Sequence, residues 1–424
     1  MGECPIGWKR VPIIDLCAKH TDCVNRTAPI VDYETPYKMI RTSNIKNGFI
    51  DCENVRYVTE EIFKKWTRRL IPKMGDIILT REAPLGDVGK IRTEDSIFLG
   101  QRLYHFRVNP NYLNEDFLLY SLLADDLQGQ IQGFGSGATV EHMRLADIPN
   151  LTINIPPIKV QNKIATILSA YDDLIENNTR RIKILEEMAQ NLYREWFVKF
   201  RFPGHEHARF VDSPLGQIPE GWEVKSMLDI VEVRPRIPVP KSEEIIFVPM
   251  GSLAENSMLI EGFEIRDKPS GARFQNGDTL FARITPCLEN GKTGFVQFLP
   301  TDDTIACGST EFIVLRSKTA CPEYVYLMSR SDTFRDHAIK SMTGATGRQR
   351  VTEKCFEQYT LAQPPESVLK QFQDIVQPQF NLIYSLNREN QNLRTTRDLL
   401  LPKLISGEVD VSDLNIRIPE AAMT

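Results

Sequence analysis

Residues 158–196 read IKVQNKIATILSAYDDLIENNTRRIKILEEMAQNLYREW, and this segment sets the architecture of the chain. Apolar or aromatic side chains recur along it at alternating spacings of four and three residues, with only Asn178 polar. Such spacing over more than four heptads is typical of a coiled-coil seam, in which a single Asn commonly fixes the register. At 1.5 Å per residue the predicted helix is about 58 Å long. The seam positions are Ile164, Leu168, Tyr171, Ile175, Asn178, Ile182, Leu185, Ala189, Leu192 and Trp196.

A second, weaker seam follows Pro364-Pro365, as the first follows Pro156-Pro157. Proline suits a helix start, because its φ is already helical and its missing N–H needs no partner there. Pro378 lies inside the second helix and is predicted to kink or break it near its first third. The second seam comprises Phe372, Val376, Gln379, Ile383, Leu386, Asn390, Leu393, Arg397 and Leu400.

Both helices belong to an internal repeat. Residues 5–8 (PIGW) recur at 219–222 (PEGW), and the pattern Gly-Asp-x4-Arg-x2-Pro-x4-Gly-Lys occupies 75–90 and again 277–292. The order of the matches never changes, and their offsets drift only as loop insertions would make them drift. The chain is therefore two copies of one unit of about 210 residues.

Each copy begins with a globular part of mixed character. Short apolar runs such as 76–80 and 311–315 lie between Gly, Pro and Asn turns, which is typical of strands. We expect an α/β (α+β) fold, with two globular domains related by a pseudo-two-fold axis and joined by two long helices. The helices should form an antiparallel coiled coil, because the second buries its stripe most simply by running back along the first. The predicted segments are 1–156 (first domain), 157–202 (central helix), 203–364 (linker and second domain) and 365–424 (C-terminal helix and tail).

The composition is that of an ordinary globular protein, with 42% hydrophobic and 25% charged residues among 424. No apolar stretch approaches the ~18 residues of a membrane span, and the N-terminus lacks a signal-peptide core, so we expect a cytoplasmic protein. The net charge of −5 excludes a wholly basic nucleic-acid binder, but not a binder with a local basic face. Eight cysteines without a CxxC pair favour reduced core thiols.

No catalytic or metal-binding pattern stands out. Residues 133–138 match a loose GxGxxA, but polar residues rather than a strand precede them, so a cofactor loop is not expected. No methylation motif surrounds Pro156 or Pro364, and no Walker loop occurs. We therefore expect no catalytic residue, no metal site and no cofactor in this chain.

Three segments resemble the specificity (S) subunits of type I restriction–modification enzymes, and the resemblance covers nearly the whole chain. They are LYREWFVKFR at 192–201, PLGQIPEGW at 214–222 and LPKLISGE at 401–408. The resemblance implies that the globular parts are target-recognition domains, each reading half of a split, asymmetric site on double-stranded DNA, while the helices set the gap between the halves.

The same resemblance implies the partners. The chain would be a non-catalytic subunit of a bacterial host-defence complex that carries two methyltransferase (M) subunits and, through them, restriction (R) subunits. S-adenosylmethionine, ATP and Mg would be bound by those partners.

Candidate DNA contacts come from the repeat and from a loop that differs between the copies. The loop after Gly-Ala-Thr spans 139–144 in one copy and 346–351 in the other. Sequence readers should differ between copies, and Arg and Gln have the geometry to read guanine and adenine edges. The predicted DNA-binding residues are Arg81, Lys90, Arg102, His142, Arg144, Arg283, Lys292, Lys340, Arg348, Gln349 and Arg350.

Residues that the two copies share have a competing interpretation. Arg81 and Arg283 occupy one position of the repeat. They either approach DNA phosphates or belong to a structural turn, in which Asp76 would pair with Arg81 from a neighbouring strand.

Aromatic and apolar residues gather at two helix ends, at Trp196, Phe197 and Phe200 and at Leu404 and Ile405. Packing within the chain is one interpretation, and docking of M subunits, which the resemblance implies, is the other. Different functions also stay open: a coiled-coil scaffold with protein-binding domains, a methyltransferase–nuclease fragment, or a decayed specificity subunit.

Overall fold

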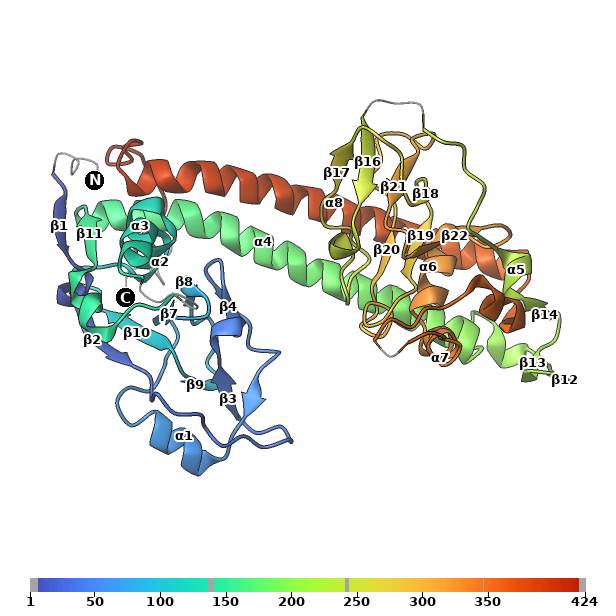
Figure 1. Ribbon diagram of the computed structural model, residues 1–424, viewed down its shortest axis with the longest axis horizontal. Coiled ribbons are helices and arrows are strands. Elements are labelled where there is room, and N and C mark those ends of the chain that lie inside the picture. The colour runs from blue at the N-terminus through green and yellow to red at the C-terminus, as the bar shows by residue number, and fades with distance from the viewer. Residues whose placement is uncertain (1–6, 136–140, 241–243, 346, 419–424) are drawn as a thin grey trace. The chain divides into compact units, whose positions relative to one another are not determined.

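The computed structural model describes residues 7–135, 141–240, 244–345 and 347–418 (Figure 1). The chain divides into two compact units. Unit 1 comprises residues 1–175 and 392–424, and unit 2 comprises residues 176–391. The two long helices contribute to both units, and each unit is described by itself below.

Unit 1 is built on a four-stranded sheet in the order β2-β10-β7-β8, with a second sheet in the order β6-β3-β9. Strands β1 and β11 form a separate antiparallel pair, as do β4 and β5. The strands are β1 (Lys9–Pro12), β2 (Cys17–Asp22), β3 (Tyr37–Ile40), β4 (Ile45–Lys46), β5 (Phe49–Ile50), β6 (Arg56–Tyr57), β7 (Ile77–Arg81), β8 (Leu85–Lys90), β9 (Ser96–Leu99), β10 (Leu103–Val108) and β11 (Thr152–Ile155). The short helices are α1 (Glu60–Trp66), α2 (Glu115–Leu123) and α3 (Asp125–Gly133).

Unit 2 has a four-stranded sheet in the order β15-β22-β19-β20 and a second in the order β17-β16-β21-β18. Its strands are β12 (Phe210–Ser213), β13 (Gly216–Pro219), β14 (Glu223–Ser226), β15 (Val231–Val233), β16 (Ile245–Val248), β17 (Glu264–Arg266), β18 (Ala272–Phe274), β19 (Thr279–Ala282), β20 (Thr293–Phe295), β21 (Ala306–Gly308), β22 (Phe312–Ser317) and β23 (Thr360–Gln363). Its short helices are α5 (Met227–Ile230), α6 (Pro322–Arg330) and α7 (Asp332–Lys340).

The two units repeat one topology, which confirms the internal repeat. In each, the first strand of the main sheet pairs with the strand that precedes two short helices, and that strand pairs with the strand of the Gly-Asp motif. In each second sheet, one parallel pair occurs at the same place, β3 with β9 and β16 with β21. The motif prolines match as well, because Ala83–Pro84 and Thr285–Pro286 are both cis peptide bonds.

The main sheets are apolar on both faces, which explains the unbroken apolar run in β7. Ile77 and Leu79 belong to a core shared with α2 and the long helices, whereas Ile78 packs into the core of the second sheet. In unit 2, Phe281 and Leu280 divide in the same way. A sheet covered on both faces requires continuous rather than alternating hydrophobicity.

The two long helices are α4 (Ile158–Tyr193), extended by a π-helical turn over Arg194–Val198, and α8 (Glu366–Ile405). They start after the predicted Pro-Pro pairs. Within each unit they lie side by side and antiparallel (Figure 1). Buried seam positions are Ile164, Leu168, Ile175, Asn178, Ile182, Ala189, Trp196, Phe372, Val376, Ile383, Leu386 and Asn390. Half-buried ones are Tyr171, Leu185, Leu192, Gln379, Leu393, Arg397 and Leu400.

Of the kink or break expected at Pro378, the break is wrong, because α8 continues through this residue as one helix. Pro378 is exposed, and so is Asp374, whose carbonyl loses its helical N–H partner. Water can bond that carbonyl, while Val376 and Phe380 stay buried on the opposite face and hold the helix in place. Among the described residues, no helix combines the length and apolarity that crossing a membrane requires.

Candidate nucleic-acid interface

Three segments of unit 1 meet at the end of β7. The main-chain carbonyl of Arg81 accepts a hydrogen bond from the Met143 N–H at 2.9 Å, and the Arg81 Nη1 donates back to the Met143 carbonyl at 2.9 Å. The Arg81 N–H donates to the Arg102 carbonyl at 2.8 Å. The motif hairpin, the turn before β10 and the loop around His142 are therefore joined.

Unit 2 joins the equivalent three segments. The Val351 N–H donates to the Arg283 carbonyl at 2.9 Å, and the Arg283 N–H donates to the Glu311 carbonyl at 3.0 Å. Thr285 and Gln349 add a reciprocal pair: the Gln349 N–H donates to Thr285 Oγ1, and the Thr285 N–H donates to the Gln349 carbonyl, both at 3.1 Å. The structure thus brings together the motif arginines and the loop residues, which were predicted as two separate groups of DNA contacts.

The charges at this junction differ between the units. In unit 1, Arg102 is 45% exposed and pairs with Glu82 at 3.2 Å, and Arg144 pairs with Asp147 at 3.1 Å while staying 68% exposed. Ion pairs this exposed contribute little stability, so a phosphate or base edge can compete for either guanidinium. The backbone of His142 bridges that of Glu82 beside them.

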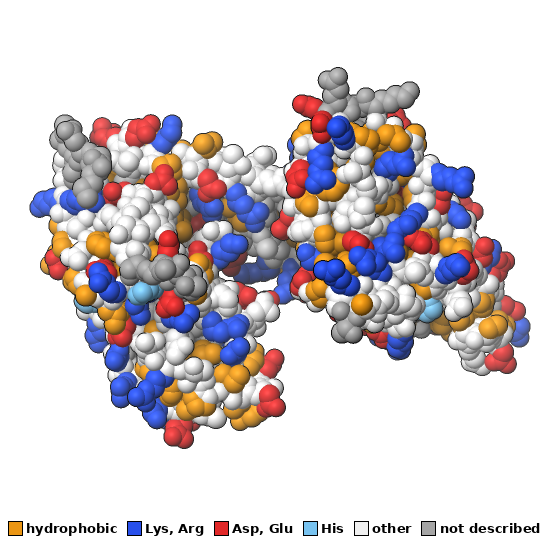
Figure 2. All heavy atoms as spheres, viewed as in Figure 1, with side chains coloured by type: hydrophobic (Ala, Val, Ile, Leu, Met, Phe, Trp, Pro, Cys, Tyr) orange, Lys and Arg blue, Asp and Glu red, His pale blue; other side chains and the backbone are white. Residues whose placement is uncertain are grey.

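In unit 2 an acid replaces Arg102 at the equivalent turn. Glu311 accepts both Nη2 (2.8 Å) and Nε (3.0 Å) of Arg350. These hydrogen bonds from Arg350 lower the pKa of Glu311 below its usual value. Arg348 is exposed on the same loop. The two units therefore offer different donors and acceptors on one backbone frame. Figure 2 shows Lys and Arg side chains clustered on the drawn face of each unit.

Residues 137–140 and Thr346, which form much of the two Gly-Ala-Thr loops, lie outside the described residues, as do Pro5 and Ile6. His142 and Arg144 in unit 1, and Arg348, Gln349 and Arg350 in unit 2, are described.

Three predicted basic residues lie apart from these junctions. The Lys90 Nζ is within 2.7 Å of Asp116 and 3.2 Å of Glu115, which ties β8 to α2, and the Lys90 side chain is only 14% exposed. The Lys292 Nζ donates to the Met250 carbonyl at 3.3 Å. Lys340 is exposed at the end of α7. The two motif lysines thus have internal partners in this structure.

The predicted pairing of Asp76 with Arg81 is wrong. The two residues lie at opposite ends of the same strand segment. The Asp76 carboxylate instead accepts hydrogen bonds from β10: from Arg107 Nη2 and Nε at 2.6 and 2.8 Å, and from His105 Nε2 at 2.6 Å. Asp278 and Arg316 repeat this pair in unit 2, with both contacts at 2.7 Å. Arg107 and Arg316 occupy equivalent places in β10 and β22, the strands that pair with β7 and β19.

The structure also explains why the motif has a glycine at position 89. A Cβ there would lie 2.5 Å from Ile50 Cγ1 and 2.9 Å from the Phe49 carbonyl, so only glycine lets β8 lie against the β4–β5 hairpin.

The aromatic residues predicted as a possible dock are internal. Trp196 and Phe197 are buried, with ring centroids 5.8 and 4.7 Å from Phe372, and Phe200 packs 5.3 Å from Trp222. Leu404 and Ile405 are likewise buried in the unit 1 core. This burial supports the packing interpretation and leaves these side chains little surface for an M subunit.

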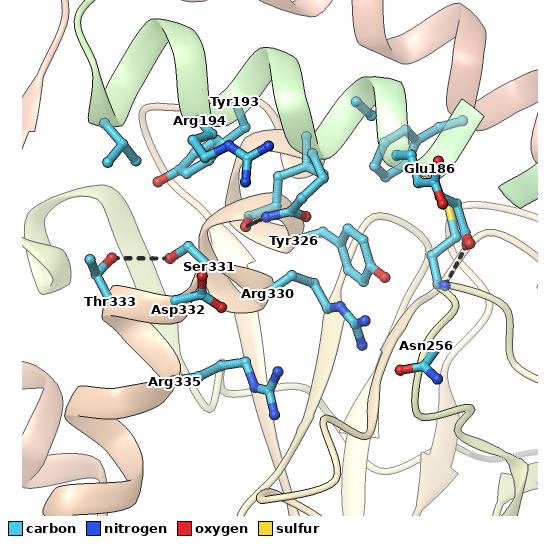
Figure 3. A pocket seen from close by; sticks show the side chains of 17 residues that line it. Glu186, Tyr193, Arg194, Asn256, Tyr326, Arg330, Ser331, Asp332, Thr333 and Arg335 are labelled. Carbon is cyan, nitrogen blue, oxygen red and sulfur yellow. Dashed lines mark hydrogen bonds between the residues drawn. The ribbon is translucent and has the colours of Figure 1, made fainter. Parts of the chain in front are cut away.

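A cavity of about 380 Å³ in unit 2 lies between α4 and the α6–α7 pair (Figure 3). Glu186 Oε1 accepts from the Met258 N–H and from Ser257 Oγ, both at 2.7 Å, and burial raises the pKa of Glu186. Arg330 donates to the carbonyls of Glu255 and Gly291 at 2.9 and 2.7 Å. Glu186 and Arg330 thus hold loops of unit 2 in place, which indicates that these two side chains have a structural role.

Comparisons with known proteins find similar proteins of one kind. Residues 5–187 match the family described as "Type I restriction modification DNA specificity domain". The chain is 26% identical over 370 residues to the type I restriction enzyme MjaIX specificity subunit of Methanocaldococcus jannaschii, covering 85% of this chain and 83% of that protein. It is 34% identical over 154 residues to the EcoAI specificity subunit of Escherichia coli, covering 35% of this chain and 26% of that protein.

The fold agrees as well. The crystal structure of a type I restriction–modification S subunit from M. genitalium matches 94% of this chain and 96% of its own, with a TM-score of 0.57 at 14% identity. The family match in the first half, the relative aligned along most of the chain and the shared fold lead to one conclusion. Over most of its length the chain is similar to the specificity subunits of type I restriction–modification enzymes.

Proposed function

We propose that this chain is a specificity subunit that reads a split, asymmetric double-stranded DNA site, with one half contacted by unit 1 and the other by unit 2. One observation carries the proposal: the same three segments are joined by the same backbone hydrogen bonds in both units, but they present different side chains. Arg102 stands where unit 2 has Glu311, and His142 stands where the second loop has Arg350. A shared frame with different readers fits two different half-sites.

In this proposal Arg81, Arg102, His142 and Arg144 contact DNA from unit 1. Arg283, Lys340, Arg348, Gln349 and Arg350 do so from unit 2. Lys90 and Lys292 stabilise the frame instead, because they lie apart from the junctions and their ammonium groups already have internal partners.

The chemistry belongs to other subunits in this proposal. The chain would carry two methyltransferase subunits and, through them, restriction subunits in the cytoplasm. These partners would bind S-adenosylmethionine, ATP and Mg. The names of the relatives, each a specificity subunit of a type I restriction enzyme, support such a division of labour.

The test is to co-express the chain with the M subunit encoded beside it and to sequence the host DNA for modified bases. A split motif that carries methyl groups, and that disappears when this chain is deleted, is the expected result. An unmodified genome despite a stable M–S complex would identify a decayed reader. Failure to form any complex with M would favour the protein-binding scaffold.

A further inference from the structure

Unit 1 contains a pocket lined by four arginines. Arg26, Arg41, Arg56 and Arg102 line a volume of about 270 Å³ together with Gln101, and no acidic side chain of the described residues lines it. The four come from separate segments: the loop after β2, the end of β3, the start of β6 and the turn before β10.

The charges in this pocket are poorly neutralised. The Arg41 side chain donates to Asn44 Oδ1 at 3.3 Å and to the Asn54 carbonyl at 3.1 Å, both uncharged acceptors. Arg102 has one acidic partner, Glu82, at 3.2 Å. Arg26 and Arg56 are exposed, and their side chains make no hydrogen bond or ion pair within the described part of the chain. Four like charges around one hollow favour an anion between them.

Unit 2 contains a second pocket of this kind. Arg234, Arg236 and Arg273 line a volume of about 590 Å³ beside Thr310 and Phe312, again without an acidic side chain in the lining. Arg234 pairs with Glu353 at 2.7 Å. Arg236 and Arg273 form no ion pair or side-chain hydrogen bond with the residues that the structure describes.

Two walls of the pockets are equivalent in the repeat. Arg26 follows the edge strand β2 of the main sheet, and Arg234 and Arg236 follow its counterpart β15. Gln101 and Thr310 precede the partner strands β10 and β22. The third wall differs, because β3 and β6 supply it in unit 1 and β18 supplies it in unit 2.

Each pocket borders the junction described above. The Arg102 carbonyl accepts from the Arg81 N–H, and Glu353, the partner of Arg234, lies 3.8 Å from Arg283 Nη1. Arg102 and Arg234 also share a left-handed backbone, with φ of 69° and 52°. Such a conformation is costly for a side-chain-bearing residue and is often found at functional sites.

We propose that each pocket binds a backbone phosphate of the DNA next to the bases that its unit reads. This inference rests on the proposed function and deepens it. Guanidinium groups match phosphate geometry and keep their charge at any physiological pH. A site placed alike in both units suits the part of DNA that every half-site shares, and phosphate contacts fix register without reading sequence.

The experiment measures DNA affinity of the M–S complex against salt concentration. Two double variants remove the unpartnered charges, Arg26→Ala with Arg56→Ala in unit 1 and Arg236→Ala with Arg273→Ala in unit 2. A control, Arg68→Ala with Arg209→Ala, removes two exposed arginines outside both pockets. The wild type and each variant are tested on two duplexes. One carries the target sequence found by sequencing of methylated bases, and the other has an unrelated sequence.

Loss of one phosphate contact should flatten the plot of log K against log salt by about 0.9. We expect that change, and an affinity loss by the same factor on both sequences, for each pocket variant and not for the control. Unchanged slopes, or a loss confined to the target sequence, would overturn the pocket assignment. A wild-type complex that binds no DNA would instead overturn the proposed function.

Free phosphate is the other source of the same chemistry. Inorganic phosphate at constant ionic strength should leave the Tm of the full chain unchanged. A Tm increase that the pocket variants lose, together with unchanged salt slopes, would assign the pockets to a small anion and overturn the DNA inference.

Discussion

Arg397 of α8 donates from Nη1 to Oδ1 of Asp172 on α4, 2.5 Å away, inside unit 1. The same carboxylate accepts from the Tyr120 hydroxyl of α2 through Oδ2 at 2.8 Å, and the Asp172 side chain is 1% exposed. One buried charge therefore joins both long helices to the globular part of unit 1, and it matches α4 against α8 at one register.

Asp172→Ala should destabilise unit 1 strongly. The change leaves the buried Tyr120 hydroxyl without its acceptor and leaves the Arg397 guanidinium with only the exposed carboxylate of Asp398. Removing one partner of a buried ion pair typically costs about 3–5 kcal/mol. Urea unfolding of the full chain measures this loss. Replacing both partners, Asp172→Leu with Arg397→Leu, should cost less, because the buried carboxylate and the guanidinium that it pairs with are then removed together. A single variant as stable as the wild type would show that this pair does not hold the helices.

Asp76 predicts a loss of stability in acid. Burial alone would raise the pKa of Asp76, but hydrogen bonds from Arg107 and His105 outweigh burial and lower it. A carboxyl with a lowered folded-state pKa stabilises the protein above its unfolded pKa, about 3.9, and loses that contribution as the pH falls through the folded value.

Asp76→Asn should therefore lower the free energy of unfolding at pH 7, and its deficit should shrink as the pH falls below about 4. Urea unfolding at several pH values gives both quantities. Asp32→Asn is a contrasting surface control, since Asp32 is exposed and its carboxylate forms no hydrogen bond or ion pair with the residues that the structure describes. A pH-independent deficit for Asp76→Asn would place its effect in packing rather than in charge.

The repeat, the two helices and their seams were predictable because they depend on local periodicity. The partners of charged residues were not, because strand pairing chooses them: Asp76 meets Arg107 only after β7 and β10 align. The same limit hid the arginine pocket of unit 1, whose members come from four segments. Trp196 and Phe197 show another limit, since an aromatic helix end has the same composition whether it packs inward or binds a partner.

Glu186 predicts the opposite pH dependence to Asp76. Burial raises the pKa of Glu186, so its ionised form is disfavoured in the folded chain, and its contribution to stability falls as the pH rises through the folded value. Glu186→Gln keeps the oxygen that accepts from Ser257 and Met258 but removes the charge. We expect the Tm of the variant, relative to that of the wild type, to be higher at pH 8 than at pH 5.

The neighbouring variant Glu187→Gln is the matched control, because Glu187 is exposed and should shift the Tm little at either pH. A Glu186→Gln protein that melts below the wild type at pH 8 would mean that a charged carboxylate is needed at this position, and the burial argument would fail.

We expect Arg348 and Arg144 to determine the base preference in different halves of the DNA site. Both side chains are exposed on the equivalent loops of the two units. Arg348→Ala should relax the base preference at one position of the half read by unit 2, at a cost of about 1–3 kcal/mol in binding. Arg144→Ala should do the same in the other half only.

Sequencing of methylated bases in cells that express each variant with M measures both halves at once. The phosphate contacts stay intact in these variants, so affinity for unrelated DNA should not change. Loss of preference in both halves from a single substitution would contradict independent reading, because the loops of one unit would then influence the bases assigned to the other.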